Sequence, residues 1–358
     1  MKGLYRYLAP FAPDYSGAAS VFFGMGGLTV ICDPGGCSGN VCGYDEPRFY
    51  GGKGLLFSAA IRDLDTIFGR DDVLEKKIIS ALSATGVNFG ALVGTPVVSV
   101  IGTDMKALGH ILKKRTGIDI AVAETNGMDL YDKGEEKGYM GLISAFAQQQ
   151  VDPDEKFILV LGALPMNMLS GVGLKEIEKN ISCLNSEKLI FAGQPDSLEI
   201  FKKLRNITSC AVVAPAGLKA ARYLQREYDI PYSVFFPDNA VFDGIADKLR
   251  DNIHKKCRIL IIHQQIAGNA LRKKLMAELA EYDAEMTVGT WFTLDSELAQ
   301  PQDHHFDDED NFIDIIDNYD IIIGDPFFKK ALRTWNGEFI DLIHYGVSGD
   351  LYSWENKI

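Results

Sequence analysis

The chain has 358 residues, 47% of them hydrophobic, and a formal net charge of −13. The chain is too long to fold around one ordinary hydrophobic core and is long enough for two or three domains. Because phosphate binding needs a clustered basic face, the acidic balance argues against nucleic acid as a partner. The longest mainly apolar run, residues 89–102, contains Gly94 and Pro96 and is shorter than the roughly 20 residues that cross a bilayer, so no membrane span is expected.

The amino terminus and the cysteines indicate the compartment. The first residues contain no apolar core followed by a small-residue cleavage site, so we expect no signal peptide. Six cysteines without a secretory signal are typical of reduced thiols or metal ligands rather than of a disulfide framework. We therefore expect a cytoplasmic protein.

Apolar, strand-like runs alternate with helical patterns along the chain, which indicates a mostly parallel sheet with helices on its faces. In the first part we expect strands at 28–32, 89–93 and 118–123 and helices near 73–85 and 103–115. The polar segment 148–155, with Pro153, predicts a linker. The first domain is therefore expected to span residues 1–150.

Two further series of the same kind follow. Strands are expected at 156–162, 188–193, 211–214, 257–263, 318–325 and 339–343, with a helix at 269–282. We expect a second domain at residues 151–240 and a third at 241–358. The fold class is thus α/β, with three Rossmann-like parallel-sheet domains in series. In such sheets ligands bind beyond the carboxyl ends of the strands, so a ligand is expected at the domain interfaces.

Several common active-site patterns are absent from the sequence. No Gly-x-Gly-x-x-Gly follows a strand, and no phosphate-binding loop ends in Gly-Lys-Ser/Thr. The chain is therefore expected neither to bind NAD in the usual way nor to hydrolyse ATP itself. His263 ends a predicted strand, where a ligand role competes with that of a hydrogen-bonded structural histidine, and we favour the structural role.

The most informative segment is residues 29–43, where an apolar strand runs into a glycine-rich turn with three cysteines, Cys32, Cys37 and Cys42. Thiolates are soft ligands that suit zinc or iron–sulfur clusters. Gly35 and Gly36 would let the backbone approach an inorganic core, and we expect them, with Asp33, to contact the cofactor. The segment is a candidate metallocluster site.

The cysteines differ in their expected roles. Cys32 lies at a strand end, where the role of a metal ligand competes with that of a small buried hydrophobic residue. Cys37 lies in the turn itself. Cys183, Cys210 and Cys257 lie singly within or beside apolar elements, so we expect all three to be structural. The four-residue gaps between the loop cysteines do not match the tight Cys-x-x-Cys spacing of structural zinc.

Three short motifs occur in a characteristic order. A strand leads into Asp33-Pro34-Gly35-Gly36-Cys37; Asp65-Thr66-Ile67-Phe68-Gly69-Arg70 and Gly94-Thr95-Pro96, continuing to Asp104, follow downstream. In this order and spacing the chain resembles the component 1 proteins of nitrogenase and nitrogenase-like reductases. The resemblance covers most of the chain, at the short end of the family.

Two departures from the family concern the cluster ligands. The family has a ligand cysteine at the position of Pro96, and its upstream cysteine has no counterpart in residues 15–20. Only Cys37 carries over directly, and Cys42 or Cys32 would have to substitute for the missing ligands. Two thiolates from each of two chains would supply the four that a [4Fe–4S] cluster needs, and we favour Cys37 with Cys42. The sequence thus predicts a two-fold dimer, or pairing with a sister subunit, at this loop.

The resemblance implies a reductase component. Such a protein accepts electrons from an ATP-hydrolysing iron–sulfur partner and passes them to an unsaturated small molecule, of which a tetrapyrrole is our preferred example. Two alternatives remain open: a non-catalytic scaffold or carrier for assembly of a metallocofactor or tetrapyrrole, and a metal-free small-molecule binding protein.

Overall fold

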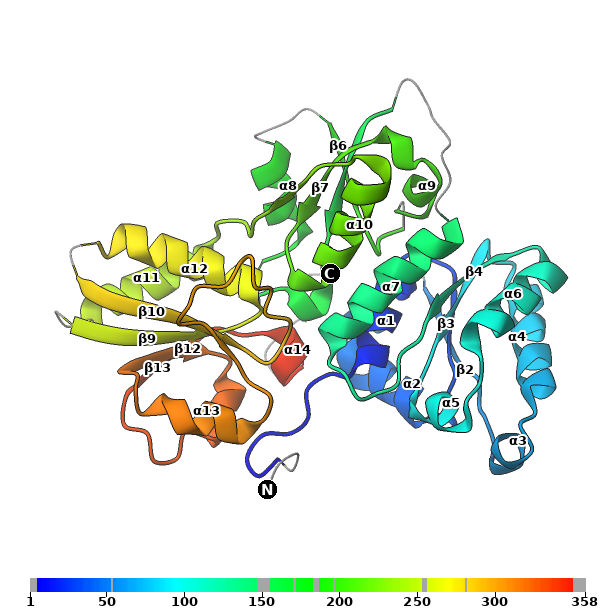
Figure 1. Ribbon diagram of the computed structural model, residues 1–358, viewed down its shortest axis with the longest axis horizontal. Coiled ribbons are helices and arrows are strands. Elements are labelled where there is room, and N and C mark those ends of the chain that lie inside the picture. The colour runs from blue at the N-terminus through cyan, green and yellow to red at the C-terminus, as the bar shows by residue number, and fades with distance from the viewer. Residues whose placement is uncertain are drawn as a thin grey trace.

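The computed structural model describes residues 5–52, 54–146, 155–169, 172–182, 187–195, 197–252, 256–280 and 282–349. These residues form three parallel β-sheets, each taken from one stretch of the chain and flanked by helices (Figure 1). The α/β class with three Rossmann-like sheets in series is confirmed. The domain boundaries near residues 150 and 240 stay a prediction, and residues 148–154 of the expected linker lie outside the described part.

The first sheet has the strand order β2-β1-β3-β4, and every neighbouring pair is parallel. Its strands are β1 (Leu28–Ile31), β2 (Leu55–Ser58), β3 (Phe89–Val93) and β4 (Asp119–Ala123). Buried side chains of α1 and α7 pack with one face, and those of α4 and α6 with the other. These helices are α1 (Asp14–Phe23), α4 (Asp71–Thr85), α6 (Met105–Thr116) and α7 (Tyr131–Phe146).

Glycines let α1 and α7 approach each other closely. A Cβ atom on Gly17 would overlap the carbonyl oxygen of Tyr131, and one on Gly134 would overlap that of Asp14. Backbone contact at this range excludes any side chain. Since α7 lies at the centre of the molecule (Figure 1), this packing also positions the face that α7 presents to the second and third sheets.

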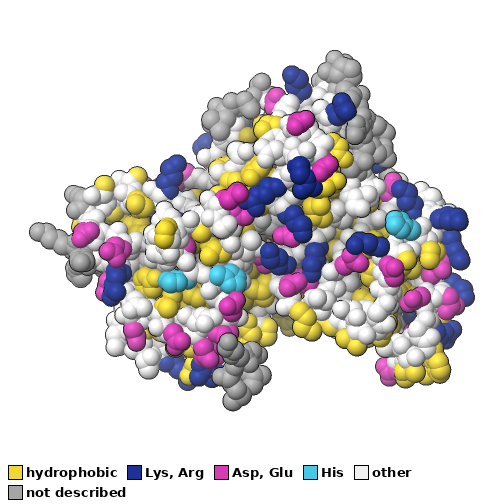
Figure 2. All heavy atoms as spheres, viewed as in Figure 1, with side chains coloured by type: hydrophobic (Ala, Val, Ile, Leu, Met, Phe, Trp, Pro, Cys, Tyr) yellow, Lys and Arg dark blue, Asp and Glu magenta, His cyan; other side chains and the backbone are white. Residues whose placement is uncertain are grey.

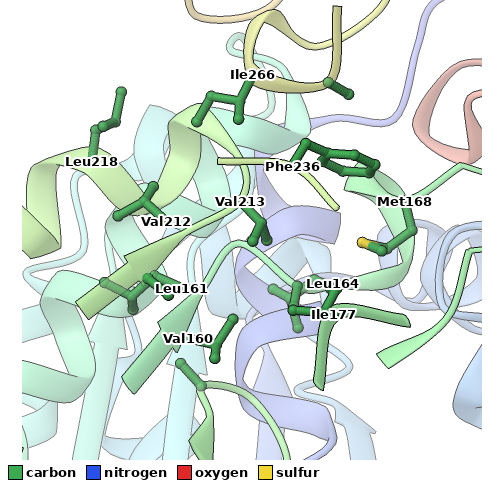
Figure 3. Close-up of a cluster of buried hydrophobic side chains, with 14 of the residues drawn as sticks. Val160, Leu161, Leu164, Met168, Ile177, Val212, Val213, Leu218, Phe236 and Ile266 are labelled. Carbon is green, nitrogen blue, oxygen red and sulfur yellow. The ribbon is translucent and has the colours of Figure 1, made fainter. Parts of the chain in front are cut away.

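The second sheet has the order β6-β5-β7-β8. It comprises β5 (Phe157–Leu161), β6 (Lys188–Phe191), β7 (Ile207–Val212) and β8 (Tyr232–Val234), with α8 (Leu174–Ser182), α9 (Ser197–Lys202) and α10 (Leu218–Tyr228). One cluster of buried side chains continues from the first sheet through the second to the third. In Figure 3, Ile266 from the third unit lies close to the second-sheet residues Val212 and Val213. The units therefore share a core.

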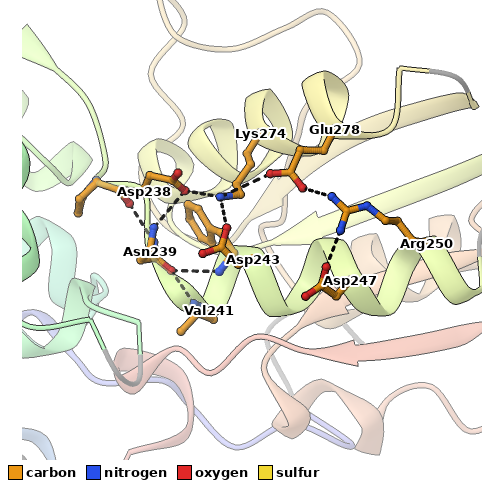
Figure 4. Close-up of polar contacts among 10 residues, drawn as sticks. Asp238, Asn239, Val241, Asp243, Asp247, Arg250, Lys274 and Glu278 are labelled. Atoms are coloured by element: carbon orange, nitrogen blue, oxygen red, sulfur yellow. Dashed lines mark hydrogen bonds and ion pairs between the residues drawn. The ribbon is translucent and has the colours of Figure 1, made fainter.

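The third sheet has the order β11-β10-β9-β12-β13. It comprises β9 (Lys256–Ile262), β10 (Asp283–Thr290), β11 (His304–His305), β12 (Ile321–Gly324) and β13 (Glu338–Asp341), with α11 (Ala240–Asn252), α12 (Gln265–Glu278), α13 (Glu309–Ile316) and α14 (Tyr345–Ser348). Ion pairs join α11 and α12 at the surface: Lys274 contacts Asp238 and Asp243, and Arg250 contacts Glu278 (Figure 4).

Most predicted strands are present within one or two residues of their expected ends, because each is a run of buried apolar side chains. The sequence patterns missed α1, β2, α7 and β10. Among the described residues, no helix is both long and apolar enough to cross a membrane.

Candidate functional site

The cysteine loop lies at the carboxyl edge of the first sheet, directly after β1. The chain leaves the strand at Cys32, turns, and enters α2 (Gly36–Asn40), which carries Cys37. A π-helical turn over Val41–Asp45 then carries Cys42. The predicted placement of a glycine-rich turn at an open sheet edge agrees with the structure.

Asp33 holds this turn together. Its buried carboxylate accepts hydrogen bonds from the Ser38 backbone N–H at 2.8 Å and from the Ser58 hydroxyl at 2.6 Å. Gly35 has φ +131°, a conformation that side chains rarely adopt, and space for a Cβ atom is open at Gly36. The carboxylate thus fixes the loop to the end of β2, and the two glycines leave its outer surface uncovered.

The three loop thiols have different environments. Cys32 is completely buried, and burial raises the pKa of its thiol to about 12, with a contribution from Asp33. Cys37 and Cys42 are partly exposed. Burial also raises the pKa of both, and a hydrogen bond from Tyr15 to Cys37 opposes the effect at that thiol. A ligand from outside can therefore reach Cys37 and Cys42 but not Cys32 without rearrangement.

The remaining cysteines and Pro96 complete the comparison with the expected ligands. Cys210 and Cys257 are buried, as expected for structural residues, whereas Cys183 lies outside the described residues. Pro96 begins α5 (Pro96–Ile101) beyond β3, the strand paired with β1, so it lies at the same edge as the cysteine loop. In the part of the chain that the structure describes, no group of three or more His, Cys, Asp or Glu side chains is arranged to hold a metal ion.

Large apolar side chains are exposed on the same edge. They are Tyr44 in the cysteine loop, Leu64, Ile67 and Phe68 in and after α3 (Asp63–Ile67), Val100 in α5, and Met128 after β4, each between 61 and 84% exposed. Each lies on a segment that follows a strand of the first parallel sheet. We call this set the carboxyl-edge apolar surface.

A second polar site lies where the three sheets meet, and we call it the three-sheet junction. The first unit contributes Tyr131 and Glu135 from α7, the second contributes Asn167 after β5, and the third contributes His263 after β9 and His344 after β13. Each of these five residues is at most 1% exposed. Strand ends and one helix face therefore bring together side chains that are up to 213 residues apart.

Direct contacts connect the junction residues. The Tyr131 hydroxyl lies 2.8 Å from His344 Nε2, and the His344 and His263 rings stack with centroids 4.0 Å apart. The Asn167 side-chain N–H donates to Glu135 Oε2 and to the Gly162 carbonyl. Glu135 Oε1 and Asn167 Oδ1 have no hydrogen-bond partner, whereas the His263 ring lies within hydrogen-bonding reach of the Ile343 backbone. Buried polar atoms without partners are rare in folded proteins and point to a functional role or a missing ligand.

Burial disfavours the charged forms of the junction side chains. It raises the pKa of Glu135 well above its ordinary value and lowers that of His263 well below its own, and it lowers the pKa of His344 to about 3. A neutral carboxylic acid can donate a proton, and a neutral imidazole can accept one. The junction thus combines a buried proton donor with two potential acceptors.

One hydrogen bond joins the two sites. The hydroxyl of Tyr345, the residue after His344, donates to the carbonyl oxygen of Tyr44 at 2.7 Å. Tyr44 lies two residues after Cys42. The cysteine loop is therefore hydrogen-bonded to the first residue of α14, which directly follows the junction residue His344.

Sequence reasoning identified only one junction residue, His263, and interpreted it as structural. His344 follows the predicted strand 339–343, so the rule that ligands bind at strand ends could have found it. The same rule could have found Asn167, which follows the predicted strand 156–162, whereas nothing identifies Tyr131 or Glu135, because helix α7 was not predicted.

The fold is that of a three-sheet α/β protein, and comparisons with known proteins agree with this fold. Residues 13–238, more than half of the chain, match the family model described as nitrogenase component 1 type oxidoreductase. The chain belongs to this family.

Solved structures show the same fold over nearly the whole chain. Nitrogenase Cp1 at pH 6.5 has a TM-score of 0.69 and 13% identity, with 95% of this chain and 87% of that chain covered. Nitrogenase Cp1 at pH 5 has a TM-score of 0.65 and 14% identity, with coverages of 96% and 85%. At such identities the likeness concerns the fold alone. A search of curated proteins found no match.

Proposed function

We propose that this protein is a nitrogenase-like reductase component. It accepts electrons from an ATP-dependent iron–sulfur partner protein and reduces an unsaturated small molecule such as a tetrapyrrole. The observation that carries this proposal is the pair of partly exposed thiols, Cys37 and Cys42, at an exposed apolar edge of a chain in this family. The cytoplasm, where thiols stay reduced, is the compartment that we propose for it.

The loop fits half of a cluster site. Cys37 and Cys42 supply two soft sulfur donors, Gly35 and Gly36 leave the surface beside them open, and Asp33 fixes the turn. One chain provides too few ligands among its described residues. An iron–sulfur cluster, when bound, supplies one-electron transfer. Cys32 was included among the candidate ligands, and its complete burial leads us to prefer Cys37 with Cys42.

A second chain would complete the site. The carboxyl-edge apolar surface is next to the loop, and its exposed side chains favour contact with another protein. We propose a two-fold dimer, or pairing with a sister subunit, across this surface. Replacing Phe68 with Asp should convert a dimer to a monomer in light scattering, whereas Met276→Asp, at an exposed apolar residue of α12, should not.

The three-sheet junction is our candidate for the substrate side of the reaction. Reduction of a double bond needs protons as well as electrons, and burial raises the pKa of the Glu135 carboxyl group, which favours its protonated form. The unpartnered oxygen atoms of Glu135 and Asn167 offer contacts to a bound molecule. The Tyr345 to Tyr44 hydrogen bond keeps this site next to the thiol loop.

The main experiment is anaerobic reconstitution with iron and sulfide, followed by metal analysis and electron paramagnetic resonance. Wild type should incorporate iron, Cys37→Ala and Cys42→Ala should lose most of it, and Cys210→Ala, which removes a buried thiol, should keep it. Equal iron in Cys37→Ala and wild type would contradict the ligand assignment. Electron transfer from a reduced iron–sulfur ATPase, dependent on ATP, then tests the reductase function.

A non-catalytic role is the second candidate, and the proline at position 96 favours it, because a proline cannot bind iron at the position where the family has a ligand cysteine. The chain would then serve as a scaffold or carrier during assembly of a metallocofactor or tetrapyrrole, or as a metal-free binding protein. Bound metal without turnover would support the carrier, and absence of metal from wild type would support the metal-free protein.

A further inference from the structure

A groove of about 540 Å³ runs between α6 and α7 over the edge strand β4, and neither the thiol loop nor the junction contributes to it. We call it the α6–α7 groove. Its volume lies in the range of small-molecule sites, which is about 300–1,000 Å³. The groove therefore has room for a ligand of its own.

The floor of the groove is apolar. Ile120 and Val122 of β4 and Met140 of α7 line it, together with small residues of both helices such as Gly109 and Ala145. Gly109 is needed because a Cβ atom there would lie 2.8 Å from a methyl group of Val122. The small residues let both helices approach the strand closely without filling the space above it.

Four lysines line the rim of the groove, and each forms an ion pair with a neighbouring carboxylate. Lys106 and Lys113 of α6, Lys137 of α7 and Lys219 of α10 line the rim, against one acidic lining residue, Glu124. Figure 2 shows Lys and Arg side chains gathered over α10, α7 and α6 on this face. Since Lys106 and Lys113 are seven residues apart in one helix, they are separated by about 10 Å along the groove.

Three of these lysines are available to a ligand. Lys106, Lys113 and Lys219 are 67, 54 and 59% exposed and now pair with Glu124, Asp119 and Glu136 respectively. Exposed ion pairs of this kind contribute little stability, and lysine has a long, rotatable stem. Turning the ammonium groups toward an anion above the apolar floor would therefore cost little, and the anion would be less screened there than in water.

We propose that the α6–α7 groove binds a small amphipathic anion, with an apolar body on Ile120, Val122 and Met140 and one or more acidic groups near Lys106 or Lys113. This site is independent of the proposed reductase function. Apolar area supplies the larger part of the binding free energy, and the lysines select for negative charge.

The test uses the fluorescent anion 8-anilinonaphthalene-1-sulfonate as the probe, with the protein in its native state. Wild type should bind one equivalent in the groove, with enhanced fluorescence. Lys106→Gln and Lys113→Gln should each weaken binding by about threefold, and by about tenfold together, because each removes one partly exposed charge contact. Ser144→Trp, which adds bulk to the lining, should weaken it further.

Matched controls separate the groove from other surfaces. Lys76→Gln removes an exposed, ion-paired lysine of α4, and Phe68→Ser removes an apolar side chain of the carboxyl-edge apolar surface. Both should bind the probe as wild type does. The uncharged analogue N-phenyl-1-naphthylamine should bind more weakly than the sulfonate and respond to Ser144→Trp but not to the lysine substitutions.

Equal affinity in wild type and the double lysine variant would overturn the proposal, as would loss of binding in Phe68→Ser alone. Because Lys106 and Lys113 are exposed, their substitution leaves the core intact, and an unchanged thermal unfolding curve checks this.

Discussion

The cysteine loop and the three-sheet junction are both built where parallel strands end, but they expose their polar groups differently. At the loop, one sheet edge faces outward, so Cys37 and Cys42 are partly exposed beside the carboxyl-edge apolar surface. At the junction, strand ends of the second and third sheets meet α7, and five polar side chains are sealed from water. The same element of the fold thus provides an exposed edge in one place and a site sealed from water in the other.

The difference also appears in the electrostatics. Solvent reaches the thiols of Cys37 and Cys42, although their partial burial raises the pKa of both. Burial penalises the charged forms of Glu135 and His344, which raises the pKa of the first and lowers that of the second. Four substitutions test this comparison, in order of decreasing expected effect on the free energy of unfolding.

Arg48→Met should destabilise the protein most, by about 3–5 kcal/mol, because it leaves a buried carboxylate without its partner. Arg48 donates to both oxygens of Glu46 at 2.7 Å, to the Ser20 carbonyl at 2.6 Å and to the Gly193 carbonyl of the second unit at 3.2 Å. It therefore anchors the end of the cysteine loop to the second sheet. Urea unfolding measures the change.

Two further variants sharpen this test. Adding Glu46→Leu to Arg48→Met should recover part of the loss, since no charge then stays buried without a partner. Arg250→Met, at an exposed ion pair with Asp247, should change the free energy of unfolding little. If Arg48→Met were as mild as Arg250→Met, the loop would not depend on the second unit.

His344→Phe should change how stability depends on pH. His344 has a pKa of about 3 in the folded protein against 6.5 for an ordinary histidine. Below pH 6.5 the unfolded chain therefore binds a proton that the folded protein does not, and stability falls as the pH falls. Between pH 6 and pH 4.5 this group should cost wild type up to about 2 kcal/mol, a loss absent from His344→Phe.

Urea unfolding at several pH values measures the two slopes. The raised pKa of Asp45, about 6, acts in the opposite direction, and it cancels because both proteins contain it. If the free energy of unfolding depends on pH in the same way in wild type and His344→Phe, His344 is not held away from water in the folded protein.

Tyr131→Phe should cost about 1 kcal/mol, because it removes one buried hydrogen bond and leaves the ring in place. The lost bond is the one to His344 Nε2 at 2.8 Å. Tyr50→Phe, at a side chain 81% exposed, provides the matched control and should have no measurable effect. A neutral result for Tyr131→Phe would indicate that water replaces the hydroxyl.

Lys274→Met should have the smallest effect, below about 1 kcal/mol, and the effect should shrink as salt is added. Lys274 pairs with Asp238 and Asp243, which are 67 and 61% exposed (Figure 4). Thermal unfolding at low and high salt checks this. A large loss of stability that does not change with salt would show that these ion pairs behave as buried ones.

The sequence predicted the strands and the cysteine loop well but missed the helix that builds the junction. Helix α7 contains Gly134, Gly138 and Gly141, and glycines within a helix weaken the helical pattern. Two of them are explained by tertiary contacts: Gly134 lies against the backbone of Asp14, and Gly141 lies against that of Val122. The local signal is therefore weak because long-range packing requires these residues.

The amino-acid sequence alone determined the three α/β series, through runs of apolar residues, and the position of a thiol-bearing turn after the first strand. Tertiary structure decided which side chains work together. It buried Cys32 while leaving Cys37 partly exposed, and it brought Tyr131, His263 and His344 from distant segments into contact. The reason is physical: periodicity and turn chemistry are local properties of the chain, whereas burial and proximity depend on how the three sheets pack against α7.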